Sequence, residues 1–484
     1  MSAAGPSQGA NSSPSGGSAA ATAASVGVVD LNAIRGGLYT FRGNPFADGA
    51  AARHYEPDAI VAMADGRIVD CGPATEVAAR LPPGTNVTRY AHALIGPGFI
   101  DAHVHYPQLP VIGAGGKPLL EWLAAYTFPA EEAYRDLDYA REVAARYVAE
   151  NLRHGITTAA VFGTVHSQSV DALFEAAQRH DLRMIAGKVL MDRNAPTALC
   201  DDAQRGYDEG KALAERWHGR GRLAYAVTPR FAATSTPAQL EAAATLWRET
   251  PGAYLQSHVA ENRAEVDWIR TLYPAHARYL DVYAHFGLLG RRAIYAHGIH
   301  LEEGEFAQLA QTHTALAHCP TSNNFLGSGL FSLRRALDAK RPVHVALGTD
   351  LGAGTSFSML RTMQAASEVA QLSGDPLPAA CAWWLATRGA AQALDLDAQI
   401  GSIEPGREAD LVVLDLHSTP LIDFRMRYVA DIDEALAVQL ALGDDRAIRA
   451  TWVAGRLAWD RDSRADAQTD AQVQHRQVPG RGRG

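Results

Sequence analysis

Apolar segments alternate with amphipathic segments along about 300 residues of this chain, starting near residue 97. Each apolar segment is short enough for a strand, and the Ala-, Leu- and Glu-rich segments between them, such as Ala130–His154 and Pro237–Thr250, are typical of helices. A run of strand-then-helix units predicts an α/β fold, a (β/α)8 barrel of the TIM type over residues 97–400. The expected strands are Gly98–His103, Ile156–Phe162, Met184–Leu190, Ala224–Arg230, Tyr254–His258, Ala293–His297, Ala315–Cys319 and Val343–Asp350.

The two flanks of this region contain short strand candidates instead of strand–helix units. In residues 27–96, Asp65-Gly66 is a two-residue turn between strands, and in residues 401–460 Ala454-Gly455 plays the same part. We therefore expect both ends of the chain to join in one small β-sandwich domain, in two parts. Residues 1–26 and 461–484 are polar and rich in small residues, which favours disordered tails.

The composition excludes several classes of protein. A net charge of -9 with interspersed acidic and basic residues argues against a nucleic-acid partner. No segment is long and apolar enough to predict a membrane span. The 4 cysteines are scattered and form no C-x-x-C pair, so a disulfide framework is not expected and the cytoplasm is the predicted location.

Histidine and aspartate residues stand at the ends of several expected strands. Because side chains alternate along a strand, His103 and His105 point to the same side. His258, His297 and Asp350 follow later strands, and the carboxyl ends of barrel strands meet at one face. His103, His105, His258 and Asp350 are the predicted ligands of one Zn²⁺ ion per subunit, a site that Fe²⁺ could also occupy.

The remaining catalytic groups are predicted from their positions beside these ligands. Asp350 can take a proton from the metal's water, and His297 can hydrogen-bond the same water. Glu261, three residues after His258, can act as a general acid and base, or else it is a surface residue that caps the next helix. A single metal is expected because the fourth strand ends in Thr228-Pro229-Arg230-Phe231, without the lysine that bridges two ions in two-metal barrels.

Several motifs resemble those of the amidohydrolase superfamily and, within it, the guanine deaminases. The resemblance extends from about residue 28 to about residue 460 and includes positions with no evident role in a metal site or a barrel. The motifs are Pro97–His105, Leu119–Glu131, Gly187–Asp192, Thr228–Phe231, Gln256–Arg263, Ala317–Asn323, Gly348–Asp350, Gly406–Leu411 and Gly443–Arg446.

This resemblance implies hydrolysis of guanine to xanthine and ammonia, in which zinc-bound hydroxide attacks C2 and Glu261 shuttles the proton. It also implies that guanine is bound by four residues and that the enzyme is a homodimer in the cytoplasm. The four are Gln108, Trp122, Arg230 and Phe231. Two alternatives remain: a related aminohydrolase acting on another amino-substituted heterocycle, and a catalytically inactive barrel that serves as a scaffold.

Overall fold

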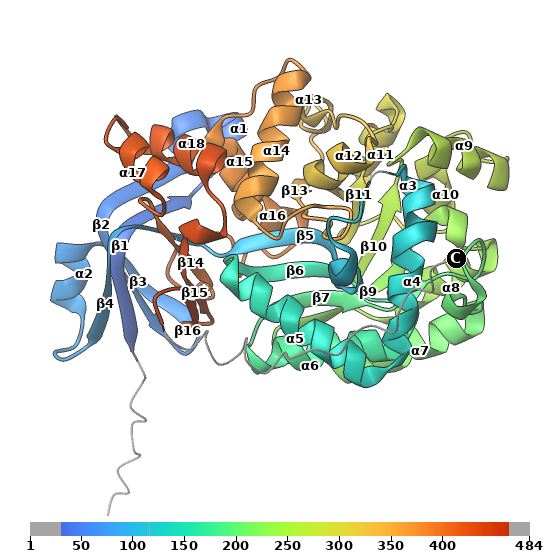
Figure 1. Cartoon of the computed structure of the whole chain (residues 1–484), viewed down its shortest axis with the longest axis horizontal. Coiled ribbons are helices and arrows are strands. Elements are labelled where there is room, and N and C mark those ends of the chain that lie inside the picture. Colours follow the sequence, from blue (N-terminus) through green and yellow to red (C-terminus); the bar gives the residue numbers. More distant parts are fainter. Residues whose placement is uncertain (1–30, 116, 464–484) are drawn as a thin grey trace, which may run out of the picture.

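The computed structural model describes residues 31–115 and 117–463, which form a barrel and an adjoining β domain (Figure 1). The predicted tail 1–26 and residues 464–484 of the predicted tail 461–484 lie outside the described residues. Arg461 is described, and its guanidinium donates to the Asp415 carboxylate at 2.9 Å. In the described part of the chain, no helix is both long and apolar enough to cross a membrane.

Parallel strands form a nearly closed barrel, which confirms the predicted (β/α)8 fold. The sheet runs in the order β13, β12, β11, β10, β9, β7, β6, β5, and β8 pairs with β9 beside this path. The backbone N–H of Asp350 donates to the carbonyl of His103 at 2.8 Å, which joins the two ends of the barrel. The strands are β5 (Phe99–His105), β6 (Ile156–Phe162), β7 (Arg183–Gly187), β8 (Val189–Leu190), β9 (Leu223–Pro229), β10 (Tyr254–Val259), β11 (Ala293–His297), β12 (Ala315–His318) and β13 (Val345–Leu347).

Helices surround the barrel strands (Figure 1). They pack through apolar faces, as in α6, where the alternation of buried and exposed residues follows the helical repeat. The helices of this layer are α5 (Leu137–Arg153), α6 (Ser167–Arg179), α7 (Ala203–Trp217), α8 (Pro237–Glu249), α9 (Arg263–Leu272), α10 (Tyr279–His285), α11 (Glu303–Thr312), α12 (Pro320–Leu326), α13 (Leu333–Ala336), α14 (Met359–Leu372), α15 (Ala379–Leu385) and α16 (Arg388–Ala393).

Two local predictions differ from the structure. The predicted helix Ala130–His154 is interrupted at Asp136, whose extended backbone separates the short helix α4 (Phe128–Glu132) from α5. The Asp136 side chain accepts hydrogen bonds from the next turn and so begins α5 as its N-cap. The predicted strand Met184–Leu190 is also divided, at Lys188, whose buried ammonium donates to Asp201 at 2.5 Å.

The two ends of the chain build one mixed seven-stranded sheet in the order β16, β15, β14, β4, β1, β2, β3. The predicted sandwich domain is built from one continuous curled sheet, whose strands enclose a cluster of buried apolar side chains. Its edge strand β3 reaches the segment before β14, because Ile68 N–H donates to Arg407 O and Gly406 N–H donates to Ile68 O, both at 2.8 Å. The strands are β1 (Asn32–Phe41), β2 (Arg53–Ala64), β3 (Arg67–Pro73), β4 (Asn86–Pro97), β14 (Leu411–Asp415), β15 (Ile448–Val453) and β16 (Arg456–Asp460).

A long connection between β5 and β6 lies over the carboxyl end of the barrel. It contains η2 (Tyr106–Val111) and then a helical run before α5 begins. This run consists of α3 (Leu119–Trp122), η3 (Leu123–Thr127), α4 and η4 (Ala133–Arg135). This connection brings residues of the first part of the barrel to the same cavity as residues that follow the later strands.

Candidate active site

The predicted metal ligands converge at the carboxyl end of the barrel. His103 and His105 lie on β5, His258 lies on β10, and Asp350 follows β13. The Asp350 Oδ1 atom lies 3.3 Å from Nε2 of His103 and 3.7 Å from Nε2 of His105. The Nε2 atoms of His105 and His258 are 3.0 Å apart. Three segments that are distant in the sequence therefore direct their donor atoms at one point.

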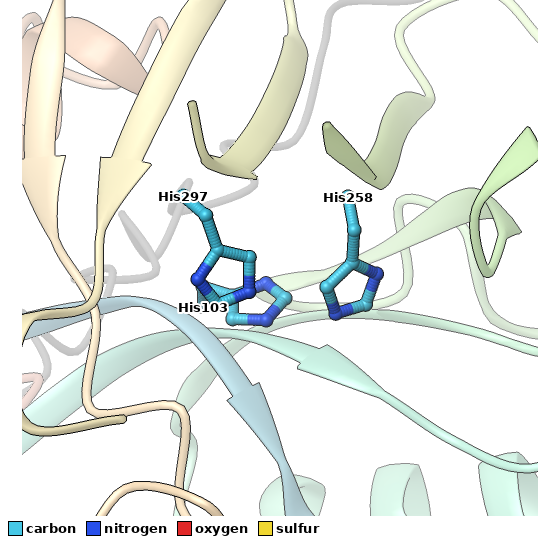
Figure 2. A group of neighbouring side chains, drawn as sticks. All are labelled: His103, His258 and His297. Atoms are coloured by element: carbon cyan, nitrogen blue, oxygen red, sulfur yellow. The ribbon is translucent and has the colours of Figure 1, made fainter. Parts of the chain in front are cut away.

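His297, at the end of β11, faces the same point. Figure 2 shows its ring beside those of His103 and His258, and ligand atoms of these three residues lie within 4.8 Å of one another. His103, His105 and Asp350 form a second such group. The distances alone make His297 a neighbour of the metal position, and its role beside a water remains a prediction.

The chemistry of these donors fits a divalent metal ion. Among the described residues, the buried Nε2 atoms of His103 and His297 have no hydrogen-bond partner, which is costly unless a ligand satisfies them. Burial lowers the pKa of His103, His105 and His258 well below the usual value, so the rings are neutral and can coordinate. Neutral imidazoles with a carboxylate are a donor set suited to zinc and to iron(II).

Hydrogen bonds to the other ring nitrogens orient two of these histidines. Nδ1 of His258 donates to the backbone carbonyl of Arg230 at 2.6 Å, which leaves Nε2 free to coordinate. Nδ1 of His297 lies 2.9 Å from Oδ1 of Asn323, an acceptor in α12. Asn323 thus places the proton of His297 on Nδ1 and leaves Nε2 as an acceptor toward the site.

Glu261 is buried in the site and is not a surface residue. Its Oε2 atom lies 3.4 Å from Nε2 of His297, and Ser328 Oγ donates to its Oε1 atom at 3.3 Å. Burial and the nearby Asp350 carboxylate raise the pKa of Glu261 to about 8. The cap of α9 is instead made by Asn262 and Glu265. The structure thus excludes the surface-cap interpretation of Glu261.

The backbone around Glu261 is held in an unusual conformation. Ala260 has a φ of 50°, a left-handed value that is unfavourable for a residue with a side chain. The Glu265 carboxylate accepts from the backbone N–H of Glu261 at 2.9 Å and from Asn262 at 3.1 Å, and it also accepts from the Tyr279 hydroxyl at 2.7 Å. Glu265 and Tyr279 therefore fix the chain that carries Glu261.

A comparable support positions Asp350. Asp350 has a φ of 47°, also left-handed, in the loop that follows β13. The preceding residue, Thr349, donates to the carboxylate of Asp101 through its backbone N–H at 2.8 Å and through its hydroxyl at 2.5 Å. Asp101 lies on β5, at one edge of the barrel sheet, and Thr349 follows β13 at the other edge. The hydrogen bonds between them therefore determine where the loop presents Asp350.

A pocket lies in front of these groups. Its lining includes three of the four predicted metal ligands and all four residues that are predicted to bind the substrate. Trp122 donates its indole N–H to the carbonyl of Ala114 at 2.6 Å, which leaves the ring face for contact. The lining residues that matter for the argument are His105, His258, His297, Glu261, Asp350, Gln108, Trp122, Arg230 and Phe231.

Comparison with known proteins agrees with this geometry. The family model described as "Amidohydrolase family" matches residues 94–458. Guanine deaminase of Escherichia coli (strain K12) is 47% identical over 435 residues, which cover 89% of this chain and 98% of that protein. The chain belongs to the guanine deaminase family of amidohydrolases.

Solved structures of guanine deaminases share the whole architecture. The structure of E. coli guanine deaminase matches with a TM-score of 0.87 at 47% identity, and the match covers 89% of this chain and 100% of that one. Guanine deaminase from C. acetobutylicum, solved with guanine bound in its active site, matches with a TM-score of 0.79 at 27% identity, covering 89% and 100%.

Several residues that shape this guanine deaminase-like site were not predicted as functional. Glu131 belongs to a motif that carries the family resemblance, and Asp101 lies in the histidine-bearing strand, so both had a signal in the sequence. Asn323 also belongs to such a motif, whereas Glu265 and Ser328 lie outside the motifs. Their importance depends on contacts with Glu261 and His297 that only the folded chain makes.

Proposed function

We propose that this chain catalyses the hydrolytic deamination of guanine to xanthine and ammonia. The observation that carries the proposal is the lining of one cavity by two kinds of group. A metal-binding donor set and a buried carboxyl group line it together with groups able to recognise a purine. Membership of the guanine deaminase family supports the choice of guanine over other amino-substituted heterocycles.

The proposed metal is a single zinc ion held by His103, His105, His258 and Asp350, with iron(II) as the alternative. When bound, such an ion makes water a nucleophile near neutral pH. Metal analysis of the purified protein distinguishes the two ions. A protein that retains full activity after exhaustive chelation would contradict the requirement for either one.

The proposed roles of the protein groups follow from their positions. Asp350 accepts a proton from the water that attacks C2, and His297 accepts a hydrogen bond from that water through Nε2. Glu261 donates a proton to N3 of the ring, is reprotonated by the proton that Asp350 took from the water, and gives that proton to the leaving amine, which departs as ammonia. The proton of the C2 hydroxyl returns to Glu261 as the C2=O bond forms. The balance is one guanine and one water giving one xanthine and one ammonia.

Recognition of the ring is assigned to the four other lining residues, Gln108, Trp122, Arg230 and Phe231. Arg230 donates to acceptors of the purine, and the Gln108 amide bonds another part of the same base. Trp122 and Phe231 present aromatic surface against which the flat ring can stack. Both aromatic residues are almost completely buried, so the protein holds their rings in place before the ligand arrives.

The test is ammonia release from guanine by the zinc-loaded full chain. We expect turnover of guanine with formation of xanthine in equal amount, measured by a coupled ammonia assay and by the ultraviolet spectrum of the purine. If the metal-loaded protein releases ammonia from a pterin or a triazine but not from guanine, that compound replaces guanine as the assigned substrate. Metal-loaded protein inactive on all of these compounds would favour the scaffold alternative.

We also propose that the chain is a homodimer in the cytoplasm. The helix α17 (Pro420–Met426) and the turn after it expose apolar side chains, with Leu421 60%, Phe424 54% and Tyr428 67% exposed. Adjacent exposed apolar groups of this kind favour a protein contact. Light scattering should give twice the chain mass of 51.8 kDa, and a monomer mass at micromolar concentration would refute the dimer. Cell fractionation tests the location.

A further inference from the structure

Arg230, which lines the cavity, forms an ion pair with a buried residue that is not part of the lining, Glu131. Nη1 of Arg230 donates to both carboxylate oxygens of Glu131, at 2.9 and 2.8 Å, across a separation of 99 residues. The side chains are 3% and 0% exposed. Glu131 comes from α4, in the long connection over the barrel, whereas Arg230 follows β9. The pair therefore joins the connection between β5 and β6 to the end of the barrel strand β9.

Glu131 also contacts a second residue of the recognition side. Burial raises the pKa of Glu131, while the Arg230 guanidinium and a hydrogen bond from Gln108 oppose that rise. An ionised carboxylate only accepts hydrogen bonds, so the Gln108 group that faces it must be the amide NH₂. The Gln108 Oε1 atom then points elsewhere, and among the described residues this buried oxygen has no partner.

The backbone of Gly352 packs against the Gln108 side chain. Gly352 has a φ of 118°, and a Cβ atom there would come within 2.3 Å of both Cβ and Oε1 of Gln108. A side chain at position 352 would therefore displace Gln108, whose amide NH₂ is oriented by its hydrogen bond to Glu131. Its free group is an acceptor.

Arg230 is left with free donors. Glu131 occupies Nη1, and no described residue is recorded as accepting from Nε or Nη2. Because one carboxylate anchors both side chains, the free acceptor of Gln108 and the free donors of Arg230 belong to one rigid unit. We name Glu131, Gln108 and Arg230 the recognition triad.

We infer that Glu131 is a positioning residue, which holds Gln108 and Arg230 so that the recognition triad selects purines with a lactam group. A lactam group is a ring N–H next to a ring C=O. This inference rests on the proposed function. With C2 and N3 facing the metal site and Glu261, the adjacent N1–H and O6 of guanine remain for recognition. N1–H donates to Gln108 Oε1, and O6 accepts from Arg230. A purine without the lactam has an acceptor at N1, opposite the acceptor of Gln108, and no oxygen at C6.

The test measures binding of two purines that are not substrates because they have no 2-amino group. Hypoxanthine has the lactam, and unsubstituted purine does not. In calorimetric titrations of the zinc-loaded full chain, we expect Glu131→Gln to weaken hypoxanthine binding at least tenfold, on the order of one lost buried hydrogen bond, and to change purine binding less than threefold. The KM for guanine should rise more than kcat falls.

Two further variants make the result interpretable. Glu132→Gln is the matched control, because it makes the same chemical change at the next residue of α4, whose side chain is partly exposed and not buried against Arg230. Glu131→Asp keeps the charge but shortens the side chain, and it should give the same selective loss to a smaller degree. This second variant decides the question if removing the buried charge prevents folding.

Two outcomes would overturn the inference. Equal weakening of hypoxanthine and purine would show that Glu131 only supports the cavity as a whole, and unchanged binding of both would show that it has no part in recognition. Failure of the proposed function gives a different result, namely wild-type protein that binds metal but releases no ammonia from guanine. The binding ratio of the two purines is measured independently of turnover.

Discussion

Glu261→Gln is expected to lower ammonia release from guanine about 100- to 10,000-fold, the usual contribution of a general acid and base. The variant keeps the shape of the side chain, and the bonds from the Glu261 backbone to Glu265 remain possible. What it loses is the ability to give and take a proton at a position 3.4 Å from Nε2 of His297. The measurement is kcat at saturating guanine, with zinc content determined on the same sample.

The control for this variant is Glu303→Gln. Glu303 lies in α11 with its side chain 62% exposed and paired with Arg335, so the same chemical change occurs away from the cavity. The control should retain the wild-type rate. A Glu261→Gln protein that keeps more than a tenth of the wild-type kcat would show that another group moves the proton, and the assignment of Glu261 would then be abandoned.

Asp350→Asn is expected to reduce both metal binding and turnover, the latter by at least about 1,000-fold. The Asp350 carboxylate lies among the rings of His103, His105 and His297, at 3.3, 3.7 and 3.8 Å from their Nε2 atoms. Replacing it with an amide removes the negative charge of the donor set and the acceptor for the water's proton. Metal content and kcat are measured with and without added zinc.

The two variants fail in distinguishable ways. Glu261→Gln should retain its zinc, because Glu261 is not a predicted ligand. Asp350→Asn should lose zinc on dialysis and stay slow when excess zinc is restored, since its proton acceptor is missing. Asp397→Asn, outside the cavity lining, is the matched control. Asp350→Asn protein with full zinc content and wild-type turnover would remove Asp350 from both roles.

The barrel and its catalytic face followed from local patterns in the sequence. A short apolar segment that must bury both faces favours a strand, and an amphipathic segment favours a covering helix, so alternation of the two predicts the fold. The convergence of His103, His105, His258 and Asp350 was predictable for a related reason. Each follows or ends a parallel strand, and parallel barrel strands present their carboxyl ends at the same face.

Other features depended on partners far away in the sequence. The N-cap at Asp136 is a local feature, but the apolar pattern continues on both sides of it. The sequence therefore predicted one helix where the structure has two. The curled end sheet closes through bonds between Ile68 and residues 406–407, which strand propensity cannot foresee. The left-handed backbone at Ala260 and Asp350 is tolerated only because surrounding hydrogen bonds hold it.

The sequence by itself therefore determined which candidate residues meet at the carboxyl end of the barrel, because donor type and position at strand ends are properties of short segments. The tertiary structure decided how those residues are oriented. Glu131 reaches Arg230 across 99 residues, and Asp101 reaches Thr349 across 248. Such pairings depend on where buried polar groups of distant segments meet, and each group must then find its hydrogen-bond partner in the folded protein or lose the water it had before folding.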